Sequence, residues 1–268
     1  MTITIMGGDL RQHYAARALA NMGYHVYIAP LEHPIEEAKT GDVLLLPVPA
    51  TKDGRRLNAT MDTPPDLLEL ARGAAPRIFG GGFGGVFMKE MRLGGKRVTD
   101  LLDVPSFVEE NAVLTAEAAL GVGMEAAKRS LRHTTVGVIG YGRIASRLTR
   151  LLLLLGAEVL VFARREDARL TATLDGAIAY PIEEAKIHLS RCRLLYNTAP
   201  APILDRQVTS ALSHCAIVEL ASGRENITLT GAPDVTLTFA HSLPGKILSC
   251  SAGEVIASTL HQILKKEG

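Results

Sequence analysis

The sequence predicts an α/β protein with two doubly wound parallel-sheet domains. Short runs rich in β-branched residues alternate with longer helical patterns along the chain, and several runs, such as Val43–Pro47, are continuously apolar. Continuous apolar strands are typical of parallel sheets that are covered on both faces. A strand, a glycine turn and an amphipathic helix also follow one another twice, with the same spacing from Gly7 to Gly23 and from Gly140 to Gly156. Two such openings predict two domains.

The strands and the long helices divide the chain into parts. We expect a flavodoxin-like α/β domain over residues 1–110, a linking helix over 111–132 and a second domain over 133–251. A C-terminal helix over 252–266 is expected to pack on the first domain or in the cleft beside it, or else to cap the domain that precedes it. In chain order, the expected strands are Thr2–Met6, His25–Ala29, Val43–Pro47, Arg77–Phe79, Arg97–Leu101, Thr135–Ile139, Glu158–Ala163, Ala177–Tyr180, Leu194–Asn197, Ala216–Leu220 and Thr236–Phe239.

The composition argues against several classes of protein. The 268 residues include 29 Lys and Arg against 28 Asp and Glu, and aromatic residues make up 4%. A net charge of +1 with few aromatic side chains does not favour a nucleic-acid partner. The N-terminus lacks the pattern of a secretory leader, and no apolar run is long enough to span a bilayer. We therefore expect a cytoplasmic protein with no membrane partner.

The cysteines do not indicate a disulfide framework or a metal centre. The chain contains Cys192, Cys215 and Cys250, and none of them belongs to a CxxC pair. An odd number without such spacing is typical of free thiols in a reducing compartment. No metal ion is therefore expected.

The strongest motif is a glycine-rich turn that follows the strand Thr135–Ile139 and opens a helical segment. Its pattern, G-x-G-x-x-A in this context, is the fingerprint of a Rossmann dinucleotide-binding domain. The first glycine allows a tight turn, the second lets the backbone approach a pyrophosphate, and the helix N-terminus offers amide donors to the phosphates. The alternative is a glycine turn that binds no nucleotide. The residues assigned to this site are Gly140, Gly142, Arg143, Ile144 and Ala145.

The end of the following strand favours NADP over NAD. An NAD site usually has Asp or Glu about 20 residues beyond the glycines, where it binds the ribose 2′-hydroxyl. This chain has Phe162-Ala163-Arg164-Arg165 instead. Guanidinium groups suit a 2′-phosphate. Arg164 and Arg165 are therefore predicted to bind NADP, unless they are solvated surface charges.

The first domain has no equivalent fingerprint. Its first turn reads Gly7-Gly8-Asp9-Leu10-Arg11-Gln12, which places a carboxylate at the start of the helix. Asp9 suits a helix cap but would repel a phosphate. We expect this domain to bind substrate or a partner, with Asp9 and Arg11 as substrate residues; Asp9 as a plain cap is the alternative. The stretch Gly80–Gly85 is either a flexible lid or a strand-end turn.

Further candidates follow the other strands of the second domain, because doubly wound sheets bind ligands at the carboxyl ends of their strands. Asn197 and Thr198 are expected at the cofactor, and Ser222 and Arg224 at the substrate. Glu117, in the linking helix, either belongs to the substrate site or lies on a solvated helix face.

Two residues near the C-terminus are the candidates for catalysis. His241 follows the last expected strand and can exchange a proton near neutral pH. Lys246 can hold a carboxylate of the substrate. A lone histidine is more often structural, so a structural His241 is the alternative.

A series of short segments along nearly the whole chain resembles the family of dipicolinate synthase A subunits from spore-forming bacteria. The layout is also similar to that of D-2-hydroxyacid dehydrogenases. The segments that carry the resemblance are Gly7-Gly8-Asp9-x-Arg11-Gln12, Leu46-Pro47-Val48-Pro49-Ala50-Thr51, Asn111-x-x-x-Thr115-Ala116-Glu117, Val138-x-Gly140-x-Gly142-Arg143, Asn197-Thr198-x-Pro200, Glu219-Leu220-Ala221-Ser222 and Leu243-Pro244-Gly245-Lys246 before Ala252-Gly253.

The resemblance implies an activity. That family oxidises a hydroxy-tetrahydrodipicolinate to pyridine-2,6-dicarboxylate (dipicolinate) during sporulation, with NADP as hydride acceptor. Its members work with a partner, a flavoprotein-like B subunit. The resemblance therefore implies a small dicarboxylate substrate, that partner, and a homo- or hetero-oligomer. Arg11, Lys246 and Arg224 would pair with the carboxylates of the substrate.

Two other interpretations remain open. A relative of the D-2-hydroxyacid dehydrogenases needs an Arg, an acidic residue and a His around the substrate carbonyl, and only Arg224 and His241 are available as part of such a set. A non-catalytic NADP-binding regulatory subunit is the other interpretation, because the sequence defines the catalytic base only weakly.

Overall fold

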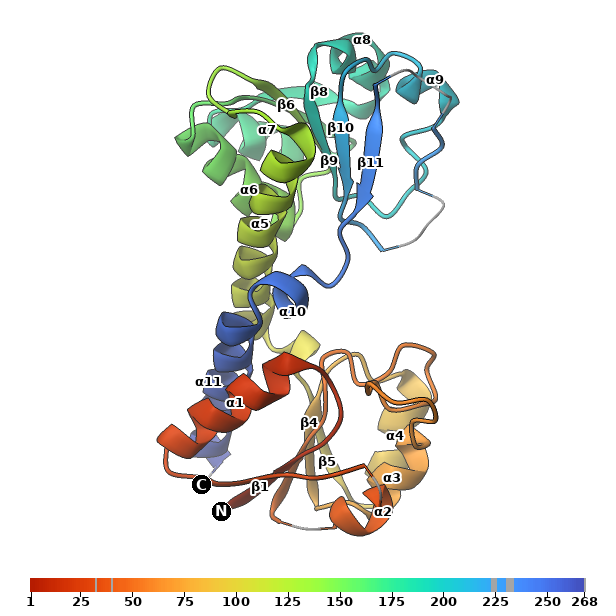
Figure 1. Ribbon diagram of the computed structural model, residues 1–268, viewed down its shortest axis with the longest axis vertical. Helices are drawn as coiled ribbons and strands as arrows, with labels where there is room; N and C mark the ends of the chain where they lie inside the picture. The colour runs from red at the N-terminus through yellow and green to blue at the C-terminus, as the bar shows by residue number, and fades with distance from the viewer. Residues whose placement is uncertain (32, 40, 223–225, 230–233, 268) are drawn as a thin grey trace. The chain divides into compact units, whose positions relative to one another are not determined.

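The computed structural model describes residues 1–268 apart from 32, 40, 223–225, 230–233 and 268. The chain forms two compact units (Figure 1). The first unit comprises Met1–Asn111 and Pro244–Gly268, and the second comprises Ala112–Leu243. The chain thus leaves the first unit, forms the second, and returns to the first for its last segment.

Among the described residues, the first unit contains a five-stranded parallel sheet in the order β2-β1-β3-β4-β5. This is the order of flavodoxin-like folds, with the reversal between β1 and β3. The strands are β1 (Thr2–Ile5), β2 (His25–Ile28), β3 (Val43–Leu45), β4 (Arg77–Gly80) and β5 (Arg97–Asp100). The helices are α1 (Leu10–Asn21), α2 (Pro34–Glu37), α3 (Leu67–Gly73), α4 (Gly85–Leu93), the short η1 (Leu101–Asp103) and the C-terminal α11 (Ser249–Glu267).

Both faces of this sheet are buried, because successive residues of a strand point to opposite sides. Ile3 and Ile5 of β1 belong to the core formed with α1 and α11. Leu44 of β3 and Ile78 of β4 belong to the core formed with α3 and α4. Figure 1 shows α1 and α11 on one side of the sheet and α3 and α4 on the other. The burial of both sheet faces explains the continuous apolar runs in the sequence.

The C-terminal helix α11 packs along α1 and belongs to the first unit. A Cβ on Gly253 would lie 2.6 Å from the carbonyl oxygen of Arg11, so the two helices meet backbone to backbone. Farther along α11, the Tyr24 hydroxyl lies 3.0 Å from Nδ1 of His261. Arg77 and Glu267 form an ion pair near the end of the helix.

Within its described residues, the second unit contains a six-stranded parallel sheet in the order β11-β10-β9-β6-β7-β8. This is the Rossmann order, with the reversal between β6 and β9. The strands are β6 (Thr135–Ile139), β7 (Glu158–Ala163), β8 (Ile178–Pro181), β9 (Leu194–Asn197), β10 (Ala216–Glu219) and β11 (Thr236–Phe239). The helices are α6 (Arg143–Leu154), α7 (Glu166–Leu174), η2 (Ile182–Glu184), α8 (Ala185–His188), η3 (Leu189–Arg191) and α9 (Arg206–Thr209).

Two further helices connect the units in sequence, α5 (Pro105–Ala127) and α10 (Leu243–Ile247). Both sheets are parallel and doubly wound, which confirms the predicted fold class. In the described part of the chain, no helix has the length and apolar character needed to cross a membrane.

The linking helix differs from its expected bounds of 111–132. It begins at Pro105, because the fixed φ of proline suits the first position of a helix. It ends at Ala127, and the next residue, Lys128, leaves the helix with a left-handed φ of 49°. Its C-terminal part belongs to the second unit, where Gly123 lies against Tyr196.

The glycine stretch Gly80–Gly85 is a strand-end turn held by one carboxylate. Asp100, at the end of β5, is 9% exposed. Its oxygens accept hydrogen bonds from the backbone N–H groups of Gly82 at 3.1 Å and Phe83 at 2.9 Å. A third bond, at 2.9 Å, comes from the N–H of Leu102. The carboxylate thus fixes the turn between β4 and α4.

Two glycines of α5 provide a matched test of its packing. A Cβ on Gly123 would lie 1.8 Å from the hydroxyl oxygen of the fully buried Tyr196. We expect Gly123→Ala to lower the free energy of unfolding of the second unit by about 1–3 kcal/mol, the usual cost of overpacking. Urea denaturation of the full chain measures this change.

The control is Gly121→Ala, because among the described residues no heavy atom beyond the adjacent residues and the surrounding helix backbone lies within 4 Å of its Cβ position. Alanine should raise the free energy of unfolding there by about 0.5–1 kcal/mol through backbone entropy. Equal effects at the two positions would show that α5 does not rest on Tyr196.

Candidate functional site

The glycine turn after β6 is fixed by the two strands beside it. The backbone N–H of Gly140 donates to the carbonyl oxygen of Phe162 at 2.8 Å. On the other side, the backbone N–H and the hydroxyl of Thr198 donate to the carbonyl oxygen of Ile139, at 3.0 and 2.7 Å. Gly140 has a φ of +87°, and a Cβ there would lie 2.8 Å from Oγ1 of Thr198. The turn therefore requires glycine at this position.

The N-terminus of α6 is open to a ligand. The N-cap residue, Gly142, provides no side-chain hydrogen bond to the first turn of the helix. In the part of the chain that the structure describes, no heavy atom apart from its chain neighbours lies within 4 Å of the position that its Cβ would take. Ala145 is fully buried and allows α6 to pack closely on the sheet. Arg143 is exposed and Ile144 half-buried in the same first turn.

The first turn of α1 in the other unit is different, because a carboxylate occupies its N-cap. Asp9 accepts a hydrogen bond from the backbone N–H of Arg11 at 3.1 Å and binds its guanidinium through both oxygens, each at 2.8 Å. The ion pair holds the pKa of Asp9 below its usual value although burial opposes this shift. The structure thus gives Asp9 the role of a helix cap.

This pairing changes the expectation for Arg11. Its side chain is only 12% exposed, and Asp9 neutralises its charge. A Cβ on Gly245 would lie 2.8 Å from its Nε, so α10 packs closely over the pair. Arg11 is therefore not a free cation for a substrate carboxylate in this structure.

An anchor that the sequence reasoning missed holds the glycine turn from the outside. The Tyr141 hydroxyl donates to one Asp175 oxygen at 2.6 Å, and Arg150 of α6 donates to the other at 2.9 Å. Burial and the neighbouring Asp175 carboxylate raise the pKa of Tyr141. The hydrogen bonds from Arg150 and Tyr141 lower the pKa of Asp175. Nothing in the local pattern signals this contact, because Asp175 lies beyond α7.

The two arginines at the end of β7 have different partners. Arg165 pairs with Asp167, and both side chains are largely exposed, at 77% and 67%. Arg164 is exposed, and its guanidinium has no hydrogen-bond or ion-pair partner among the described residues. Arg169 of α7, also missed, donates to the carbonyl oxygens of Ala163 at 3.0 Å and Arg164 at 2.7 Å. The backbone at the end of β7 is therefore fixed, while the Arg164 side chain stays available for a ligand.

The end of the neighbouring strand β9 supports the glycine turn through Asn197 and Thr198. The Asn197 side chain is fully buried and donates to Oε2 of Glu219 at 2.7 Å. The backbone N–H of Ala221 donates to Oε1 of the same carboxylate, also at 2.7 Å. We expected Asn197 to contact the cofactor directly, but its burial gives it a supporting place. A carboxylate that ends the apolar strand Ala216–Glu219 was the available signal for Glu219.

The remaining candidates are less constrained. His241 is half-buried, with its ring centroid 5.9 Å from that of Phe239. The Ser222 side chain is exposed, and its carbonyl oxygen accepts a bond from the side-chain amide of Asn226 at 3.1 Å. Glu117 and Lys246 are exposed, in α5 and α10. Arg224 lies outside the described residues.

The second unit has the features of a dehydrogenase-type nucleotide-binding domain. Residues 112–208 match the family described as the NAD binding domain of D-isomer specific 2-hydroxyacid dehydrogenases. The solved transhydrogenase from Sinorhizobium meliloti is similar in fold, with a TM-score of 0.72 at 15% identity over 100% of this chain and 94% of that one. The family match supports a nicotinamide dinucleotide cofactor and an oxidoreductase-type role, and the solved structure supports the fold.

The first unit matches a second family model. Residues 2–91 match the family described as the N-terminal domain of the dipicolinate synthase A subunit. The A subunit of dipicolinate synthase from Bacillus subtilis (strain 168) is 24% identical over 98% of this chain and 96% of its own length. The solved A subunit from Bacillus halodurans has a TM-score of 0.82 at 21% identity, covering 98% of this chain and 97% of that one. Over nearly its whole length the chain is therefore similar to the dipicolinate synthase A subunits, as the sequence motifs indicate.

The buried carboxyl of Glu219 predicts a pH dependence of stability. Burial raises the pKa of Glu219 above its ordinary value. As the pH rises from the ordinary carboxyl pKa through this raised pKa, the unfolded state ionises first, and the folded state loses stability. We expect the wild-type chain to lose stability relative to Glu219→Gln over that interval, as measured by urea unfolding at a series of pH values.

Glu117→Gln, which removes an exposed carboxylate of the same unit, is the matched control. A stability difference between the wild-type chain and Glu219→Gln that does not change with pH would contradict the burial of this carboxyl.

Proposed function

We propose that the protein is an NADP-dependent oxidoreductase subunit that makes pyridine-2,6-dicarboxylate from a hydroxy-tetrahydrodipicolinate during sporulation. Similarity to the dipicolinate synthase A subunits supports the substrate, and the glycine turn at the N-terminus of α6 supports the dinucleotide. The observation that carries the choice of NADP is the end of β7, where Arg164 is exposed and no carboxylate ends the strand.

The residues present fit a dinucleotide. The open position over Gly142 and the uncapped first turn of α6 suit a pyrophosphate. We assign the first-turn residues Arg143 and Ile144 to the backbone of this phosphate site. Arg164 is assigned to the 2′-phosphate, and Arg165 joins it when its exposed pair with Asp167 opens, which costs little free energy for such a surface pair.

The overall reaction removes one water, one hydride and one proton from the hydroxylated ring and leaves the aromatic pyridine. The bound nicotinamide supplies the hydride acceptor. The chain supplies orientation and a site for the proton. We assign the proton to the imidazole of His241, which follows β11 at the edge of the sheet where ligands bind.

The two carboxylates of the substrate need cations. Arg11 is paired with Asp9 and is therefore not assigned to them, whereas Lys246 is exposed in α10 and takes this role. Ser222 and Arg224 are further substrate candidates. Glu117 remains a candidate as an exposed carboxylate of α5.

A second polypeptide completes the enzyme in this proposal. The relative from Bacillus subtilis is named as one subunit of a synthase, which supports a hetero-oligomer with a flavoprotein-like B subunit in the cytoplasm.

Asn197 and Glu219 have a supporting role in this proposal. Their buried side chains hold the carboxyl ends of β9 and β10 in position without exposing a charge.

Titration with NADPH and NADH side by side tests the cofactor. We expect the wild-type chain to prefer NADPH and Arg164→Ala to raise the NADPH dissociation constant by about tenfold or more, because a charge-assisted contact to the 2′-phosphate is lost. The NADH dissociation constant should stay nearly constant. An equal loss for both nucleotides would contradict the assignment, and Arg165→Ala should have the smaller effect.

Turnover tests the reaction. With NADP and the partner B subunit, we expect pyridine-2,6-dicarboxylate to form, and His241→Gln to lower kcat by about 10²–10⁴-fold with NADPH binding retained. His13→Gln, at an exposed position of α1, is the control. An unchanged kcat would remove His241 from the mechanism.

The same assay separates the alternatives. Oxidation of 2-hydroxyacids in place of the cyclic substrate would favour a relative of the D-2-hydroxyacid dehydrogenases, and NADPH binding without any turnover would favour a regulatory subunit.

A further inference from the structure

We propose that the second unit carries a binding site for a small anion with two or more negative charges, in a pocket at the amino-terminal ends of β9, β10 and β11. The pocket has a volume of about 560 Å³, which is typical of small-molecule sites. One wall is the end of α5, and the other is formed by the residues that lead into the three strands. The glycine turn follows the carboxyl end of β6. The two sites therefore lie at opposite ends of the strands of one parallel sheet.

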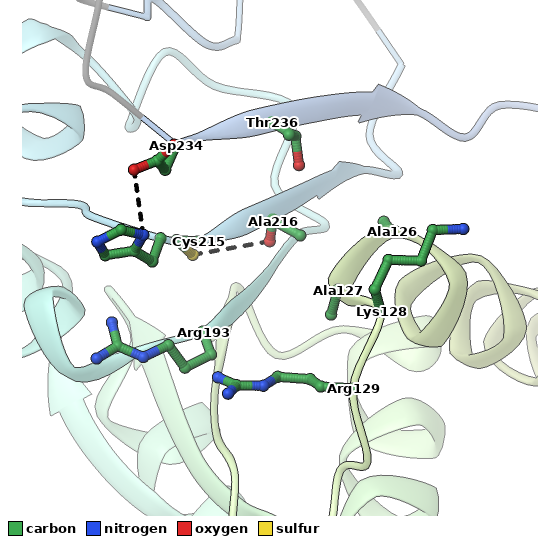
Figure 2. A pocket seen from close by; sticks show the side chains of 10 residues that line it. Ala126, Ala127, Lys128, Arg129, Arg193, Cys215, Ala216, Asp234 and Thr236 are labelled. Carbon is green, nitrogen blue, oxygen red and sulfur yellow. Dashed lines mark hydrogen bonds and ion pairs between the residues drawn. The ribbon is translucent and has the colours of Figure 1, made fainter.

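Two guanidinium groups give the pocket its charge. Arg129 reaches in from the end of α5, and Arg193 reaches in from the start of β9 (Figure 2). In Figure 2 both side chains extend to the same side, whereas the amine of Lys128 points away from them. Arg193 uses one N–H group to donate to the carbonyl oxygen of Ser213 at 3.1 Å. Its other donors remain for a ligand.

No carboxylate of the described chain compensates these two charges. The one acidic side chain that lines the pocket, Asp234, faces His214, with 3.2 Å between the carboxylate oxygen and Nδ1. Guanidinium groups bind carboxylates and phosphates through paired N–H donors. Two of them on one pocket therefore favour a ligand with at least two negative charges.

The backbone around the pocket is strained in an unusual way. Lys128, His214 and Asp234 have φ values of 49°, 48° and 65°, in the left-handed region that favours glycine. They are three of the five described non-glycine residues with a positive φ. Left-handed conformations of such residues cluster at ligand sites. Backbone strain at three lining residues supports the assignment of this pocket as a ligand-binding site.

The pocket contains no activated nucleophile among its described lining residues. Burial raises the pKa of the Cys215 thiol to about 12, so the thiol stays protonated. Its Sγ contacts the carbonyl oxygen of Ala216 at 3.7 Å. The proposed site therefore binds its ligand without covalent chemistry.

Calorimetric titration of the full chain tests the proposal with two probes, pyrophosphate and citrate, at matched ionic strength. We expect the wild-type chain to bind at least one probe, and Arg129→Gln to raise its dissociation constant by about tenfold or more. Arg129→Gln should fold normally, because the structure gives its side chain no partner among the described residues. Arg193→Gln is the second variant and should weaken binding in the same direction.

Arg132→Gln is the matched control, because Arg132 is an exposed arginine near Arg129 that does not line the pocket. It should leave the dissociation constant within about twofold of the wild-type value. Binding of pyrophosphate alone would identify a phosphorylated ligand, and binding of citrate alone would identify a carboxylate. Failure of both probes to bind, or an affinity that Arg129→Gln leaves unchanged, would overturn the proposal; in the second case the probe occupies the glycine turn instead.

Discussion

The pairing of β6 with β9 is the constraint on which the nucleotide site depends. At this reversal of strand order the chain leaves two neighbouring strands in opposite directions, and the space between the two connections is where doubly wound sheets bind ligands. Gly140 takes its left-handed conformation here, between the end of β7 and Thr198. Asn197 and Glu219 fix the next strand ends from inside the core. A shift of register between β6 and β9 would move all of these groups together.

The two units use the same opening for different purposes. Each has a strand, a glycine turn and a helix, but α6 begins with an uncapped glycine and α1 begins with the carboxylate of Asp9. A helix N-terminus attracts an anion only while its amides and dipole are uncompensated. Asp9 satisfies one of these amides and brings its own negative charge. Asp9 and the missing glycine fingerprint thus together distinguish the first unit from the second.

Local patterns in the sequence predicted the elements well, because the strands are buried and the glycine turns are local. Gly23 and Gly156, just beyond the ends of α1 and α6, have φ values of 91° and 77°, which is the left-handed conformation that glycine favours at a helix end. The pairing of Arg11 with Asp9 could also have been predicted from the sequence, because the capping carboxylate lies only two residues away. The anchor from Tyr141 to Asp175 was not, since it depends on how α6 and α7 pack. Burial of Asn197 depends likewise on Glu219, which lies one strand farther along the chain.

The return of the chain to its first unit has a consequence for how the protein is made on the ribosome. The core between the first sheet and α1 includes Ile256, Leu260 and Leu264 of α11. These side chains are synthesised after the whole of the second unit. The second unit is continuous in sequence and can fold as soon as it emerges. The unit whose synthesis starts first is therefore the last to be completed, and until then the part of its apolar core that α11 covers stays exposed.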